Sequence, residues 1–325
     1  MRVVFMGSSD AAAVTLKNLL RSPPIEVVGL ITQPDRPAGR NRQLTPCPCK
    51  FFAEQQGFKP IITPERVNEP QVLDQIEALK PDVIVVVAFG QMLGKRLLNM
   101  APHGCVNSHF SLLPKYRGAA PVQTAIASGE NVSGVTIMRL SEGMDEGDIL
   151  LKAEEPIYCD DTGESYMERL AILGAVAMVK ALRLMERKLL NAVPQNHALA
   201  TYAPKLKKEN GLINWNEPAA VIERKIRAYH PWPGTFTFLP QHVVKNQSTG
   251  RLKVITAEIE KNCADKNLKA HPGTICASNS DGFAVATGSG CLKLTVVQLD
   301  GSRRMDGRAF LNGHELQEGD CLECK

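Results

Sequence analysis

Two polar residues that stand two positions apart, Asn107 and His109, are the clearest candidates for chemistry in this 325-residue chain. They lie at the end of a short predicted strand, where side chains two positions apart lean toward the same side. The segment Gly143-Met144-Asp145-Glu146-Gly147-Asp148 follows the next long predicted strand. Its two glycines predict a tight loop that can present a carboxylate. If the two strands are neighbours, Asp145 can reach the region of His109.

An amide, an imidazole and a carboxylate at one strand edge suit acyl transfer to an amine. When an amine attacks a carbonyl group an oxyanion develops, and the Asn107 amide can donate a hydrogen bond to it. Loss of one such donor typically costs about 3–4 kcal/mol of transition-state stabilisation. His109 can donate a second bond or transfer protons, and Asp145 can set the orientation and protonation of the imidazole. A lone histidine at a strand end is more often structural, so these roles require the three side chains to meet.

The elements that would position these residues alternate between predicted strands and predicted helices. The strands are residues 2–6, 26–32, 60–63, 82–88, 104–107, 135–140 and 149–157, and the helices are residues 11–20, 68–79, 118–128 and 164–189. This alternation predicts an α/β fold with a Rossmann-like, doubly wound, mostly parallel sheet. Such sheets bind ligands at the carboxyl ends of their strands, so we expect the chemistry just after the strands that end near residues 88, 107 and 140.

The pattern changes after residue 189, which predicts a first domain of residues 1–189, a linker of residues 190–208 and a second domain of residues 209–325. A helix is predicted in the second domain, with Asn216 as its N-cap and its end near Tyr229. Five short predicted strands follow, at residues 235–239, 252–257, 273–277, 283–287 and 292–299. This spacing indicates a small OB-like β-barrel.

Composition excludes several classes of protein. Hydrophobic residues make up 44% and charged residues 22% of the chain, which is ordinary globular usage. The sequence has no apolar run of about eighteen residues, so we expect no membrane span, and the apolar start is too short for a signal peptide. The nine cysteines lack the partner spacing of a zinc site, so we expect free thiols, no bound metal and a cytoplasmic location.

The positive charge is concentrated in the C-terminal third. Residues 1–199 contain 21 basic and 21 acidic residues, whereas residues 200–325 contain 17 basic and 13 acidic residues. A basic second domain indicates a polyanionic partner such as nucleic acid, or else a solvated lysine-rich surface.

Residues 33–50 form a second basic feature, a long predicted loop with Arg36, Arg40 and Arg42. Loops of this length are usually functional or disordered.

Several motifs together resemble the methionyl-tRNA formyltransferase family. The central motif is N-x-H-x-S-L-L-P-x-x-R-G-A-A-P, which starts at Asn107, and G-V-T-I-M and G-M-D-x-G-D follow downstream. The segments Q-P-D-R-P-A-G-R from Gln33 and I-R-A-Y-H-P-W-P from Ile226 also match. The motifs fall in both predicted domains and together cover nearly the whole chain.

The resemblance implies a catalytic domain that uses 10-formyltetrahydrofolate to formylate initiator methionyl-tRNA, which allows translation to start with formylmethionine. The family's catalytic residues fall on Asn107, His109 and Asp145. Its folate-contacting residues fall on Ser111, Leu112, Leu113 and Pro114, and Gln91, Met92 and Leu93 would line the pterin side. The backbone from Ser141 to Asp145 would close the slot.

The resemblance also implies how tRNA is held. In the family, the loop of residues 33–50 enters the acceptor stem, Arg40 matches its key arginine, and Lys205 matches a linker lysine. The expected tRNA-binding residues are therefore Arg36, Arg40, Arg42, Lys205, Lys207 and Lys208. We expect a monomeric enzyme.

The sequence leaves two alternative functions open and disfavours a third. A folate-dependent formyltransferase for a small amine, such as glycinamide ribonucleotide or an amino-sugar nucleotide, would share the core motif but would need neither the basic domain nor the long loop. A non-catalytic tRNA-binding protein would leave Asn107, His109 and Asp145 without a role. A nicotinamide-dependent dehydrogenase is disfavoured because the first turn contains Gly7 but no G-x-G-x-x-G motif.

Overall fold

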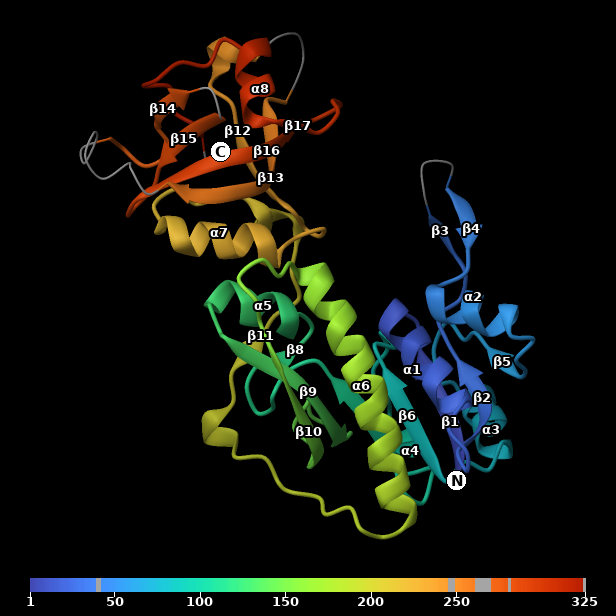
Figure 1. Ribbon diagram of the computed structural model, residues 1–325. Helices are drawn as coiled ribbons and strands as arrows, with labels where there is room; N and C mark the ends of the chain where they lie inside the picture. The colour runs from blue at the N-terminus through green and yellow to red at the C-terminus, as the bar shows by residue number, and fades with distance from the viewer. Residues whose placement is uncertain (39–41, 245–248, 261–269, 280–281, 324–325) are drawn as a thin grey trace. The chain divides into compact units, whose positions relative to one another are not determined.

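A computed structural model describes residues 1–38, 42–244, 249–260, 270–279 and 282–323 (Figure 1). By their internal contacts the residues form two compact units. Unit 1 consists of Met1–Pro121, Val132–Pro156 and Tyr166–Ala203, and unit 2 consists of Val122–Asn131, Ile157–Ser165 and Pro204–Lys325. In the described part of the chain, no helix has both the length and the apolar character needed to cross a membrane.

Unit 1 is built on a seven-stranded sheet with the order β10-β9-β7-β6-β1-β2-β5. The strands are β1 (Arg2–Gly7), β2 (Glu26–Ile31), β5 (Ile61–Ile62), β6 (Val83–Val87), β7 (Cys105–His109), β9 (Val132–Arg139) and β10 (Ile149–Pro156). Strands β5, β2, β1, β6 and β7 run parallel, and β9 and β10 pair antiparallel. The predicted α/β fold with a mostly parallel sheet is confirmed.

The direction of β9 corrects one expectation. Because β9 runs antiparallel to β7, its carboxyl end does not lie at the same sheet edge as the carboxyl end of β7. His109 is opposite Thr136, whereas Arg139, at the end of β9, is opposite Val106 near the start of β7. The loop between β9 and β10 therefore begins near the start of β7 and must fold back to reach His109.

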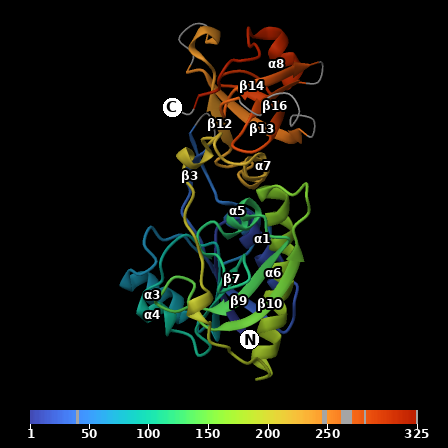
Figure 2. The same ribbon diagram turned by 90° about the vertical axis from the view of Figure 1, so that its left-hand side faces the viewer.

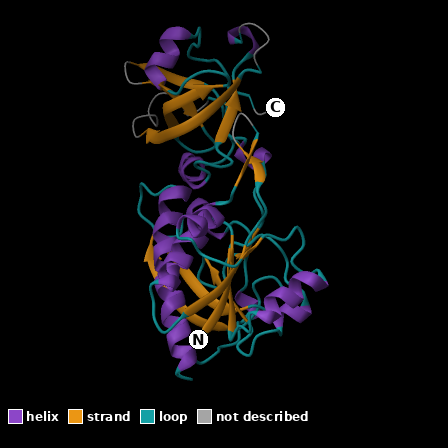
Figure 3. Cartoon of the chain, turned by 90° about the vertical axis from the view of Figure 1, so that its right-hand side faces the viewer, coloured by secondary structure: helices purple, strands orange, loops and turns teal. Residues whose placement is uncertain are grey.

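Helices cover both faces of this sheet (Figure 3). They are α1 (Asp10–Leu20), α2 (Pro48–Gln55), α3 (Pro70–Ala78), α4 (Lys95–Leu98) and, for most of its length, α6 (Gly163–Glu186). Val4 of β1 and Ile84 of β6 pack in one cluster with Leu73 of α3 and Leu97 of α4. All five residues of β6 are buried, as expected for a central strand covered on both faces.

Helix α6 packs closely against β7 on the sheet face opposite to the Asn107 and His109 side chains. A Cβ atom at Gly174 would lie 2.9 Å from the Ser108 Oγ atom, so only glycine permits this approach without a shift. Ser108 alternates with Asn107 and His109 along β7 and points to the other face. The polar pair is thus left on the face that carries α3 and α4.

Residues 33–50 of unit 1 include a β-hairpin, and are not an irregular loop throughout. Strands β3 (Arg36–Ala38) and β4 (Gln43–Thr45) pair antiparallel, and Figure 1 shows them extending away from the sheet. The base of the hairpin is held by an ion pair, because Lys50 Nζ lies 2.6 Å from Asp35 Oδ1. This hydrogen bond raises the pKa of Lys50 above its ordinary value.

Unit 2 contains a curled antiparallel sheet with the order β12-β13-β16-β15-β14, which forms a half-barrel (Figures 1 and 2). Its strands are β12 (Thr235–Phe238), β13 (Arg251–Glu260), β14 (Ile275–Asn279), β15 (Gly282–Ala286) and β16 (Cys291–Leu299), and β17 (Met305–Asp306) pairs with β16. The five predicted strands are confirmed. Cys321 bridges to Thr274 and Glu323 bridges to Phe238, so the C-terminal segment pairs next to β14 and with β12.

Two helices complete unit 2, α7 (Ala219–Ala228) and α8 (Gly307–Gly313), which was not predicted. The N-cap of α7 is Pro218, so the expectation that Asn216 caps this helix is wrong. Helix α7 also holds the two shorter segments of unit 2. Arg224 donates a 3.2 Å bond to the carbonyl of Ala127, next to the end of α5 (Pro121–Ser128), and Arg227 donates a 2.8 Å bond to the carbonyl of Asp161.

Candidate active site

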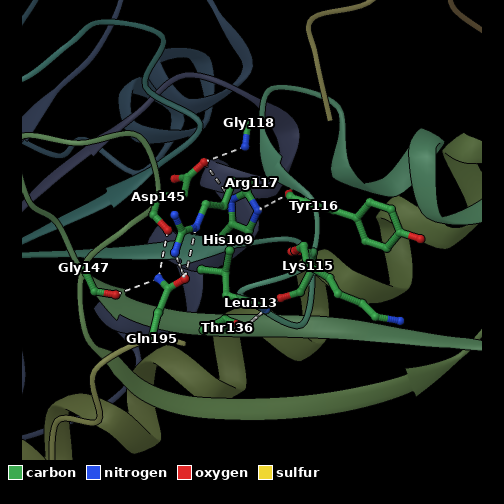
Figure 4. A network of polar contacts seen from close by, with 11 residues as sticks. His109, Leu113, Lys115, Tyr116, Arg117, Gly118, Thr136, Asp145, Gly147 and Gln195 are labelled. Atoms are coloured by element: carbon green, nitrogen blue, oxygen red, sulfur yellow. Dashed lines mark hydrogen bonds and ion pairs between the residues drawn. The ribbon is translucent and has the colours of Figure 1, made fainter. Parts of the chain in front are cut away.

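His109 ends β7 with both ring nitrogens beside oxygen atoms (Figure 4). Nε2 lies 2.9 Å from the Tyr116 carbonyl oxygen and Nδ1 lies 3.6 Å from Asp145 Oδ2. A carbonyl oxygen only accepts hydrogen bonds, so this contact assigns the proton of the neutral ring to Nε2. Nδ1 is then the nitrogen that can gain or release a proton next to the carboxylate. The ring is 6% exposed, which limits competition from water.

Asp145 is aimed at His109 by an unusual backbone conformation. Its φ angle is 53°, in the left-handed region that L-residues rarely adopt. Its carboxylate accepts a 2.8 Å hydrogen bond from the Gly118 N–H group. Two residues on, a Cβ atom at Gly147 would lie 1.9 Å from the Arg139 carbonyl oxygen, so only glycine allows the loop to pass there. The two side chains therefore meet, as the sequence predicted.

Asn107 lies one pleat before His109 on the same face of β7, and it is half-buried. Its side-chain amide forms no hydrogen bond with any other residue in the described part of the chain. Buried amides are usually satisfied within a protein, so a half-buried amide without a partner, on the strand face that carries His109, fits a donor kept for a ligand. This is the arrangement that an oxyanion donor requires.

Two buried side chains that the sequence did not single out support the same loop. Arg117 belongs to β8 (Arg117–Gly118) and is 1% exposed, and Gln195 is 5% exposed. Gln195 Oε1 accepts bonds of 3.2 and 2.8 Å from Arg117, and its Nε2 donates bonds of 2.8 and 2.7 Å to the carbonyls of Asp145 and Gly147 (Figure 4). Arg117 stands within the quoted R-G-A-A-P motif, but nothing in the sequence around Gln195 indicates this contact.

The turn after His109 is stabilised by hydrogen bonds of buried hydroxyl groups. Ser111 Oγ donates a 2.6 Å bond to the Lys115 carbonyl, and Thr136 of β9 bonds both the Ser111 carbonyl and the Leu113 N–H group. Ser111 and Leu113 are 0% exposed, whereas Leu112 and Pro114 are half-buried. The first two residues therefore shape the turn, and the other two are the ones that a ligand could contact.

The start of α4, which follows the segment after β6, lies near the loop after β9, since Lys95 Nζ lies 3.9 Å from Glu142 Oε1. Gln91 is engaged in this segment, because it accepts a bond from the Val67 N–H group and donates one to the Pro64 carbonyl. Met92 and Met144 are 67% and 55% exposed, which is unusual for methionine. Exposed apolar side chains on these two loops fit the faces of a flat ring system.

A cavity of about 710 Å³ lies toward the other end of β7, lined by residues 98–104 and 139–142. It includes none of Asn107, His109 and Asp145, although Leu140, Ser141 and Glu142 of its lining belong to the loop that carries Asp145. Within the described ranges, no three His, Cys, Asp or Glu side chains gather closely enough to hold a metal ion.

The basic residues expected to bind tRNA lie on exposed segments. In unit 1, Arg36 is exposed and pairs with Glu65 at 2.6 Å, and Arg42 is exposed at the start of β4, while Arg40 lies outside the described residues. In unit 2, Lys205, Lys207 and Lys208 are exposed at the beginning of the unit, just before and in the short helix η2 (Lys208–Gly211).

The sequence is similar to known formyl transferases over nearly its whole length. Residues 1–182 match the formyl transferase family, and residues 205–315 match the C-terminal domain of formyl transferases. The methionyl-tRNA formyltransferase of Marinobacter nauticus is 45% identical over 313 residues, which is 96% of each chain. The methionyl-tRNA formyltransferase of Citrifermentans bemidjiense is 42% identical over 322 residues, covering 99% of this chain and 96% of the relative. The chain therefore belongs to the methionyl-tRNA formyltransferase family.

Solved structures of low sequence identity share the fold. An N-formyltransferase from Helicobacter canadensis, in complex with folinic acid and dTDP-3-aminofucose, is 17% identical with a TM-score of 0.60, covering 93% of this chain and 99% of that one. HypX from Aquifex aeolicus, in complex with tetrahydrofolic acid, is 18% identical with a TM-score of 0.59, covering 96% of this chain and 47% of that one.

The site geometry predicts that Cys105 is chemically inert. It precedes Asn107 by one pleat, is 0% exposed, and burial raises the pKa of its thiol to about 12. Only about one thiol in ten thousand is then ionised at pH 8, and the thiolate is the reactive form. We expect iodoacetamide at pH 8 to modify exposed Cys159 and Cys321 but not Cys105, with formyl transfer retained, as mass spectrometry and an activity assay can show. Alkylation of Cys105 in the folded enzyme would contradict this.

Proposed function

We infer that the chain transfers a formyl group from 10-formyltetrahydrofolate to the amino group of initiator methionyl-tRNA, so that translation starts with formylmethionine. One observation carries the chemistry: the His109 imidazole lies 3.6 Å from the Asp145 carboxylate, with the free Asn107 amide on the same strand face. The substrates follow from relatives of full length that are named for methionyl-tRNA and from structural neighbours that hold folates.

We assign catalytic roles to Asn107, His109 and Asp145. As the amine nitrogen bonds to the formyl carbon, the carbonyl electron pair moves to oxygen, and the Asn107 amide donates a hydrogen bond to that oxygen. His109 Nδ1 takes the proton that the amine loses, and the Asp145 carboxylate stabilises the positive charge on the imidazole. The imidazole then returns the proton to the departing nitrogen as the second C–N bond breaks.

The folate would supply the formyl group and its leaving nitrogen. Residues of two loops and one turn would hold it: Gln91, Met92 and Leu93 after β6, the segment from Ser141 to Asp145, and Ser111, Leu112, Leu113 and Pro114 after β7. In this assignment Met92, Leu112 and Pro114 offer side-chain contacts. Gln91, Ser111 and Leu113 act by fixing the backbone, because their side chains are already engaged or buried.

The tRNA would be held by the basic hairpin and the start of unit 2, through Arg36, Arg40, Arg42, Lys205, Lys207 and Lys208. Arginine suits this role because its planar fork can donate two bonds to a phosphate or a base edge. We propose a catalytic domain of residues 1–189, a linker of residues 190–208 and a tRNA-binding domain of residues 209–325. We propose further that the enzyme acts as a monomer in the cytoplasm.

A comparison of acceptors tests this function. With 10-formyltetrahydrofolate as donor, the purified enzyme should formylate methionyl-tRNA, and it should leave free methionine and glycinamide ribonucleotide essentially unchanged. The expected reason is that a small acceptor cannot use the basic hairpin or the basic second domain. Faster formylation of glycinamide ribonucleotide than of methionyl-tRNA would overturn the proposal in favour of a small-amine enzyme.

Replacement of His109 tests the catalytic assignment. We expect His109→Ala to lower kcat by about 10²–10⁴-fold, because general acid–base help of that size is lost. The Kd for methionyl-tRNA, measured by filter binding, should not change. His242→Ala, in an exposed histidine of unit 2, is the control and should keep full activity. Equal rates of the His109 variant and the wild type would remove the catalytic role.

Replacement of Arg42 tests the role of the hairpin. Loss of one phosphate or base contact should cost about 1–3 kcal/mol, which corresponds to a rise of about 5–150-fold in KM for tRNA. The slope of log K against log salt should fall by about one, and KM for the folate should stay constant. Arg96→Ala is the control, because exposed Arg96 of α4 already pairs with Asp74 and Glu77. An unchanged KM for tRNA would count against the hairpin.

A further inference from the structure

We propose that Arg117 and Gln195 are positioning residues that hold Asp145 in the catalytic geometry. This inference depends on the proposed catalytic role of Asp145. The two side chains are 1% and 5% exposed, so together they form a buried polar pair beneath the loop of residues 143–147. Gln195 bonds the backbone of this loop directly, whereas Arg117 acts on it through Gln195 and through the Glu146 side chain.

The Gln195 side chain uses every hydrogen bond that an amide can form. Its NH₂ group donates to the carbonyls of Asp145 and Gly147 at 2.8 and 2.7 Å, and its oxygen accepts two bonds from Arg117. A glutamine offers two donors and two acceptor sites, so none is left over. By tying two carbonyls that are two residues apart, the amide fixes the turn in which Asp145 has its φ of 53°.

Arg117 decides which way the Gln195 amide points. A guanidinium group only donates hydrogen bonds, so the amide oxygen must face Arg117 and the NH₂ group must face the loop. Such a buried cation is costly unless it is paired. Arg117 is also 3.8 Å from Glu146 Oε1 and 3.3 Å from His197 Nδ1, which adds partners on the same loop and on the segment after Gln195. The orientation of the amide is therefore fixed.

The segment that carries Gln195 also fixes the second partner of the imidazole. The Thr201 hydroxyl accepts a 2.8 Å bond from the Tyr116 N–H group, and the Thr201 carbonyl accepts a 2.8 Å bond from the Arg117 N–H group. Strand β11 (Tyr202–Ala203) then pairs with β8. Because the Tyr116 carbonyl bonds His109 Nε2, this one segment holds the oxygen atoms on both sides of the ring.

We therefore expect the reaction rate to depend on the Gln195 amide more strongly than substrate binding does. If the loop relaxes, the Asp145 carboxylate moves from its place 3.6 Å from His109 Nδ1. A misplacement of about 1 Å can cost about 100-fold in rate. The Gln195 side chain bonds Arg117, Asp145 and Gly147 and none of the residues proposed to bind tRNA, so we expect the affinity for tRNA to stay unchanged.

Gln195→Glu isolates this effect, because it keeps the size of the side chain and an acceptor for Arg117 but removes both donors to the loop. We expect kcat to fall about 10–100-fold, with little change in KM for methionyl-tRNA or for 10-formyltetrahydrofolate. Gln71→Glu, the same change at an exposed position of α3, is the control and should leave kcat unchanged. Gln195→Ala, which adds no charge, should also lower kcat when measured well below its Tm. A wild-type kcat in the folded Gln195 variants would overturn the proposal.

A double-mutant cycle with Asp145→Asn then separates positioning from a merely structural role. If Gln195 acts through Asp145, Gln195→Glu should lower kcat less than about twofold in the Asp145→Asn background. The same loss of rate in both backgrounds would overturn the positioning role. A full wild-type kcat of Asp145→Asn alone would instead refute the proposed catalytic role of Asp145, so the two failures are distinguishable.

Discussion

The site depends on a loop that places the Asp145 carboxylate at the far end of β7 from the point where the loop begins. Because β9 runs antiparallel to β7, the loop that carries Asp145 starts opposite the beginning of β7, while His109 stands at its end. The two ends of β7 are roughly 13 Å apart at about 3.3 Å per residue. A loop that must cover this distance and then stop 3.6 Å from an imidazole needs to be held along its course. Gly147, which passes against the Arg139 carbonyl, and the Gln195 amide provide that restraint.

The loop is restrained by the polar side chains of Gln195 and Arg117, and there is a physical reason why apolar side chains could not replace them. An apolar side chain in place of Gln195 would leave the half-buried carbonyls of Asp145 and Gly147 without these donors. A fully buried group left unsatisfied costs about 1–3 kcal/mol, which is the upper limit for each carbonyl. With Gln195 and Arg117 present, the supporting network is satisfied before any substrate arrives. The Asn107 amide, in contrast, has no partner among the described residues. The site is thus rigid where it supports Asp145 and open where an oxyanion would form.

Much of the site could be predicted from local sequence patterns, and the rest depended on long-range contacts. The shared face of Asn107 and His109 follows from the period of two in a strand, and the glycine-flanked loop indicated Asp145. The sequence could not predict that β9 runs antiparallel to β7, because a buried strand has the same apolar pattern in either direction. Gln195 was also missed, since it meets its loop across about fifty residues of sequence in a segment that reads as a linker. The sequence of residues 33–50 does not alternate apolar and polar residues as a strand does, so the hairpin is recognised only from the pairing of β3 with β4.

The segment of residues 195–203 joins two requirements of the enzyme. It begins with the amide that restrains Asp145 and ends with β11, which pairs with β8, and the chain then enters unit 2 at Pro204. Because the N–H groups of Arg117 and Ala119 bond the carbonyls of Thr201 and Ala203, the chain leaves unit 1 at a defined point. One stretch of backbone therefore restrains the loop that carries Asp145 and fixes the point at which the chain leaves unit 1. Replacing this stretch with a flexible linker of equal length would remove both, whatever its charge.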